Sequence, residues 1–75
     1  MVRLDTLSDG ATASLTELGG DRAFRRRLME MGLLPGTALR VIRRAEVGGV
    51  MELEVRRSRL TVRLREAASV QVEPS

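Results

Sequence analysis

The sequence predicts a mainly β domain, a small, partly open barrel of about five strands with one short helix inserted after the first strand. Two stretches, residues 51–55 and 60–64, alternate apolar and polar side chains as strands with one buried face do. Glycines mark the turns between short segments, and one helical pattern ends at a glycine inside RRRLMEMGLLPG, residues 25–36. We expect the strands to close around this helix and corner.

Length and composition indicate a single domain over residues 1–75. The 43% hydrophobic and 31% charged residues are typical of a soluble globular chain. No stretch approaches the ~20 apolar residues that span a bilayer, and the first residues lack the long apolar core of a signal peptide. We therefore expect a cytoplasmic protein without direct membrane insertion.

The first strand is expected over residues 11–18, where Ala11, Ala13 and Leu15 alternate with polar side chains. A short apolar segment with Leu4 and Leu7 precedes this strand. A glycine pair then separates this strand from the helix.

The helix is expected over residues 22–31, with Asp21 as its N-cap. Helical spacing places Phe24, Leu28 and Met31 on one face, which we expect to be buried. Gly32 should end the helix, because glycine adopts the left-handed conformation without a steric penalty.

The segment Leu34-Pro35-Gly36-Thr37 predicts a type II turn, since proline presets the first central dihedral and glycine permits the positive one after it. The chain then enters a strand over residues 37–45. Its adjacent Val41 and Ile42 break the alternation, which predicts a bulge or a strong bend.

The two alternating strands are expected to form a hairpin through Arg57-Ser58, with Glu52 opposite Arg63 on the outer face. A helical turn at residues 65–68 and a last strand at 69–73 follow. The hairpin's inner face would pair three apolar couples: Val55 with Leu60, Leu53 with Val62, and Met51 with Leu64.

The chain contains no histidine and no cysteine. Imidazole or thiolate metal sites and the usual nucleophile–base pairs are therefore excluded. We expect no catalytic residue, no metal site and no cofactor, and hence no enzyme.

All 13 basic residues are arginine, and the net charge is +3. Arginine clusters suit phosphates, so a basic nucleic-acid-binding barrel is one alternative. The single aromatic residue offers no stacking platform for bases, and the acidic residues are interspersed with the basic ones. We therefore expect no nucleic-acid partner.

Three sequence blocks together resemble the FeoA family over essentially the whole chain. The blocks are Leu4, Leu7, Gly10 and Ala13; the specific run from Arg27 to Thr37; and residues 60–64 with Glu66-Ala67 and Val70-Gln71-Val72. Within the run, we expect six residues to build the structural motif: Arg27, Leu28, Met31, Gly32, Pro35 and Gly36. The chain departs from the family pattern at Arg57-Ser58, where a glycine is common.

The resemblance implies an SH3-like β-barrel and an accessory or regulatory role in bacterial ferrous iron uptake. Its partner would be the cytosolic GTPase domain of FeoB, the membrane transporter. The same domain resembles the C-terminal SH3-like domain of DtxR-type repressors, so a transition-metal-responsive regulatory domain is a second alternative. Exposed sheet edges leave a weak homo-oligomer open.

A docking surface should consist of apolar side chains that the barrel does not need, rimmed by arginine. Met29 points away from the expected buried face, and only one of Leu33 and Leu34 can easily be buried at the corner. We therefore expect partner contacts from five residues: Arg25, Arg26, Met29, Leu33 and Leu34.

Overall fold

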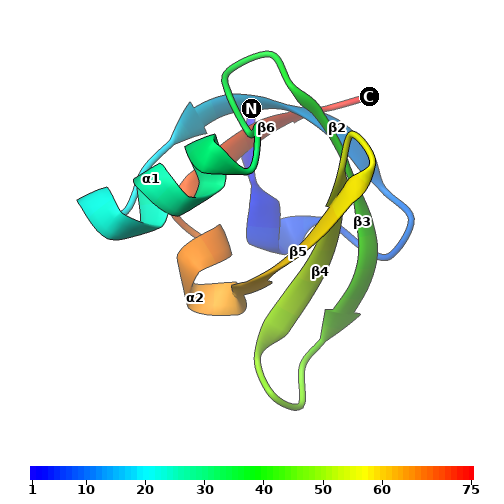
Figure 1. The fold of residues 1–75 in the computed structure, drawn as a ribbon. Helices are drawn as coiled ribbons and strands as arrows, with labels where there is room; N and C mark the ends of the chain where they lie inside the picture. Colours follow the sequence, from blue (N-terminus) through cyan, green and yellow to red (C-terminus); the bar gives the residue numbers. More distant parts are fainter.

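The computed structural model describes all of residues 1–75 as one six-stranded sheet with two α-helices (Figure 1). In chain order the elements are β1 (Val2–Arg3), the 3-10 turn η1 (Leu4–Thr6), β2 (Thr12–Leu18), α1 (Arg22–Glu30), β3 (Ala38–Ala45), β4 (Val50–Val55), β5 (Ser58–Arg63), α2 (Leu64–Ala67) and β6 (Val70–Pro74).

The strands are all antiparallel and lie in the order β1-β6-β2-β3-β4-β5. The two outer strands, β1 and β5, do not pair with each other, so the sheet curls without closing. This arrangement confirms the predicted mainly β, partly open barrel with a helix after the first long strand. The strand that was not expected is β1, where Val2 pairs with Val72 of β6.

The interior is a single cluster of 17 buried apolar side chains, with no buried polar or charged residue. In β4 the alternation places Met51, Leu53 and Val55 inward, each without exposed surface. From α1, Phe24 and Leu28 join the same cluster. Burial of these apolar groups is the main favourable contribution to folding in a chain of this size.

The predicted irregularity in the second long strand is confirmed. The pairing of β3 with β4 shifts between Val41 and Arg43, so Ile42 is the extra residue of a β-bulge. The bulge lets Val41 remain fully buried although the simple alternation is broken.

The predicted register of the β4–β5 hairpin is wrong by two residues. Leu53 lies opposite Leu60 and Met51 opposite Val62, and the connection is the two-residue turn Arg56-Arg57. Strand faces repeat every two residues, so a shift of two keeps the same side chains inside and the hydrophobic pattern cannot detect it. The other expected pairs are replaced as well. On the inner face, Val55 lies opposite Ser58, and Leu64 begins α2 instead of facing Met51. On the outer face, Arg63 lies opposite Val50 rather than Glu52.

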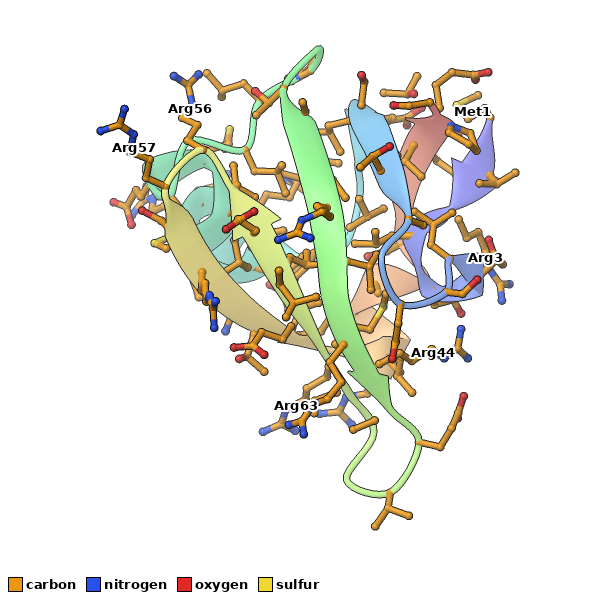
Figure 2. All side chains as sticks on the ribbon, turned by 90° about the vertical axis from the view of Figure 1, so that its right-hand side faces the viewer. Met1, Arg3, Arg44, Arg56, Arg57 and Arg63 are labelled. Atoms are coloured by element: carbon orange, nitrogen blue, oxygen red, sulfur yellow. The ribbon has the colours of Figure 1, made fainter.

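The corner between α1 and β3 and the turn between β4 and β5 lie at the same end of the molecule (Figures 1 and 2). The turn between β3 and β4, residues 46–49, lies at the opposite end. Neither helix combines the length and apolar composition needed to cross a lipid bilayer.

Candidate functional site

The end of α1 is a complete Schellman motif. Gly32 has φ 92°, its N–H donates to the carbonyl of Met29 at 3.0 Å, and the N–H of Leu33 donates to the carbonyl of Leu28 at 3.0 Å. These are the two hydrogen bonds that define the motif, and they need the left-handed residue that glycine supplies. The predicted helix stop at Gly32 is confirmed.

The type II turn that follows is also confirmed. Gly36 has φ 89°, and the N–H of Thr37 donates to the carbonyl of Leu34 at 2.8 Å. The Thr37 hydroxyl accepts from the N–H of Leu34 at 3.1 Å and donates to the carbonyl of Gly32 at 3.3 Å. A further bond, from the N–H of Gly36 to the carbonyl of Leu15 at 2.8 Å, fastens the corner to β2.

The two leucines of the corner differ in exposure. Leu33 has no exposed surface, whereas Leu34 is 45% exposed. The expectation that Leu33 contacts a partner is therefore wrong, because this residue belongs to the core. A signal was available in the sequence: in a Schellman motif the residue after the glycine packs against the helix residue five positions earlier, here Leu28.

Met31 also departs from its expected place. It is the C-cap rather than part of α1, and it is 37% exposed instead of buried. The interior below this end of the helix is already occupied by Leu28 and Leu33, both fully buried. Met31 is thus left at the surface beside the corner.

Three large apolar side chains are exposed here, which we call the corner patch: Met29, Met31 and Leu34. Met29 is 46% exposed, as its position on the helix predicted. Arg25 and Arg26 precede Met29 by four and three residues, so they are its neighbours along the helix surface. The patch places three exposed apolar side chains within six residues of the chain, with two arginines next to Met29, a composition that suits a macromolecular partner.

The arginines of α1 differ in what they contact. Arg25 is half-buried, and its guanidinium donates to the carbonyl of Gly20, while Arg26 is exposed and makes no ion pair. Arg27 pairs with Glu66 at 3.3 Å and lies 5.6 Å from the ring centroid of Phe24. Arg27 therefore connects α1 to α2 through an ion pair.

A shallow groove runs beside the corner patch. It is lined by Leu34, the Pro35-Gly36 turn, Thr37, Ala38 and Arg56. Arg56 comes from the tip of the β4–β5 hairpin, and sequence reasoning missed it because the expected register placed that tip at Arg57-Ser58. Two segments far apart in the chain thus meet at one surface.

Glu52 and Glu54, two carboxylates of β4, are not joined by a third side chain that could complete a metal site. No group of three or more His, Cys, Asp or Glu side chains is placed to hold a metal ion. Glu54 accepts from Arg40 at 3.2 Å, and Glu52 lies 4.0 Å from Arg59. These carboxylates belong to an ion-paired outer sheet surface.

Residues 2–74 match the family model of the FeoA domain. The FeoA protein from Chlorobium tepidum, solved by NMR in solution, is 36% identical, with a TM-score of 0.92 over 97% of this chain and 70% of that one. The crystal structure of an iron uptake regulatory protein, FeoA, is 24% identical, with a TM-score of 0.84 over 99% of this chain and 96% of that one.

A manganese-dependent transcriptional repressor has the same fold at 20% identity, with a TM-score of 0.91 over 99% of this chain but 41% of its own. That likeness concerns the fold alone. The fold likenesses agree with the expected SH3-like architecture, and the match over residues 2–74 covers every element described above. The chain belongs to the FeoA family.

Proposed function

We propose that this chain is a non-enzymatic accessory protein of bacterial ferrous iron uptake. In this proposal it acts in the cytoplasm by docking on the cytosolic GTPase domain of a FeoB-type iron transporter. Family membership supports the link to iron uptake, since structurally similar members include an iron uptake regulatory protein and an iron(II) transport protein A from Clostridium thermocellum.

The observation that carries the docking proposal is the corner patch. Met29, Met31 and Leu34 are 46%, 37% and 45% exposed although the barrel interior is filled without them. Exposing three large apolar side chains on one corner costs solubility, and such clusters mark interaction surfaces. The Schellman motif and the type II turn hold the corner rigidly, so little conformational entropy is lost on binding.

The proposal is tested by measuring the affinity of the purified chain for the purified GTPase domain of the transporter from the same organism. Biolayer interferometry measures this affinity directly. We expect Met29→Glu and Leu34→Glu each to weaken binding about tenfold or more, since each places a charge in a desolvated contact.

Val47→Glu is the matched control. Val47 is 94% exposed on the turn at the opposite end of the molecule, so the same change of an exposed apolar residue to glutamate should leave affinity unchanged (Figure 1). Thermal unfolding should show that all three variants remain folded. A wild-type chain that does not bind the domain, or corner variants that bind as wild type does, would contradict the proposal.

A further inference from the structure

Arg56 has a backbone conformation that arginine normally avoids. Its φ is 59°, and it is the single non-glycine residue of the chain with a positive φ. The left-handed region crowds the Cβ of an L-residue, and strained residues of this kind cluster at functional sites. The strain directs attention to what the Arg56 side chain does.

The side chain of Arg56 lies over the corner. A Cβ built on Gly32 would stand 3.5 Å from Nε of Arg56, so the guanidinium stem crosses the backbone at the helix stop. Arg56 also lines the groove formed by Leu34 and Pro35. The strained hairpin tip thus places a cation beside Leu34, one of the exposed apolar residues of the corner patch.

Arg56 forms no ion pair with a carboxylate of this chain. It is exposed and makes no ion pair, whereas Arg40 and Arg59, on the adjacent strands, lie 3.2 Å from Glu54 and 4.0 Å from Glu52. Figure 2 shows Arg56 and Arg57 together at one end of the sheet, away from Arg44 and Arg63. Arg57 likewise has no acidic partner.

We infer that Arg56 binds a carboxylate of the docking partner while an apolar side chain of the same partner segment packs on Leu34 and Pro35. The planar guanidinium matches a carboxylate with two parallel hydrogen bonds, and unpaired cations beside an apolar groove complement an acidic, apolar segment. The inference rests on the proposed function and names the chemistry of the transporter segment that the corner accepts.

The test compares four proteins in binding to the same purified GTPase domain: wild type, Arg56→Gly, Arg56→Lys and Arg65→Ala. Arg56→Gly removes the guanidinium where glycine is the favoured residue, so the Tm should stay within about 3 °C of wild type or rise. Its affinity should fall about tenfold, as expected for one lost charge-assisted contact. Arg56→Lys keeps the charge but not the planar guanidinium, so its affinity should lie between those of wild type and Arg56→Gly.

Arg65→Ala is the control for net charge, because Arg65 is an exposed arginine on α2 without an ion pair. It should bind as wild type does. Raising the salt concentration from about 50 to about 300 mM should weaken wild-type binding more steeply than that of Arg56→Gly, since only wild type makes the ionic contact.

The outcomes separate the two proposals. Wild-type binding that Arg56→Gly leaves unchanged overturns this inference and leaves the docking proposal standing. A wild-type chain that does not bind the domain overturns both. Tighter wild-type binding to double-stranded DNA than to the domain, lost in Arg56→Gly, would assign the guanidinium to phosphates and overturn the carboxylate assignment.

Discussion

Leu33 and Leu34 are neighbours in the chain with opposite environments. Leu33 has no exposed surface and packs in the core, and Leu34 is 45% exposed beside the groove. The difference arises from one left-handed glycine, because Gly32 turns the chain so that the next residue returns to the helix and the one after it leaves. Two identical side chains therefore have different environments.

Truncating the two leucines should separate stability from binding. Leu33→Ala should lower the free energy of unfolding by about 2–5 kcal/mol, because it leaves a cavity in a filled core. Leu34→Ala should lower it by less than about 1 kcal/mol and should weaken binding to the transporter domain. Urea unfolding and interferometry measure the two effects, and equal losses of stability would contradict the assigned environments.

At the scale of elements, the corner is a small hydrogen-bonded unit that connects α1 to β3. Thr37 is its centre, since its hydroxyl bonds the N–H of Leu34 and the carbonyl of Gly32, and its backbone N–H bonds the carbonyl of Leu34. The half-buried threonine thus satisfies groups on both sides of the turn. The geometry of the corner patch depends on these bonds.

Replacing Thr37 with valine keeps the shape of the side chain and removes its two hydrogen bonds. We expect the free energy of unfolding to fall by about 1–2 kcal/mol, because the Leu34 N–H and the Gly32 carbonyl lose their partner. Thr61→Val is the control, since Thr61 is an exposed β5 residue whose hydroxyl makes no hydrogen bond within the chain. A Thr37→Val protein as stable as Thr61→Val in urea would show that these bonds contribute nothing.

The whole molecule is an open sheet whose strands differ in how many neighbours they have. Strands β3 and β4 lie between two partners each, whereas β5 has one and β1 contributes two residues at the other edge. The helix α1 is held by Phe24, Leu28 and the bonds at its ends. Local opening should therefore begin at α1 and β1 and reach the central strands last.

Native-state hydrogen exchange measures this order directly. We expect the amides of β3 and β4 to exchange only through global unfolding, and those of α1 to exchange faster by about tenfold or more, because the nine-residue helix is marginal without its packing. Protection in α1 equal to that in β3 would mean that the helix and the sheet open as one unit.

Several features follow from local rules and were predictable from sequence. Three of them depend on a few adjacent residues each: the N-cap at Asp21, the helix stop at Gly32 and the type II turn at Pro35-Gly36. At the N-cap, the Asp21 carboxylate accepts from the Phe24 N–H at 2.8 Å. The bulge at Ile42 follows from a broken alternation in the same way. The resemblance carried by residues 27–37 also identified the family.

The tertiary structure alone decided the register of the β4–β5 hairpin, the exposure of Met31 and the position of Arg56. A register shift of two leaves every side chain on its face, so the alternating pattern is satisfied by either pairing. Met31 is exposed because Leu33 returns to fill the space beneath it, and Arg56 reaches the corner because two hydrogen-bonded turns meet at one end of the sheet. Local propensity determined each turn of this chain, whereas contacts between distant segments, which no short stretch of sequence encodes, assembled its candidate binding surface.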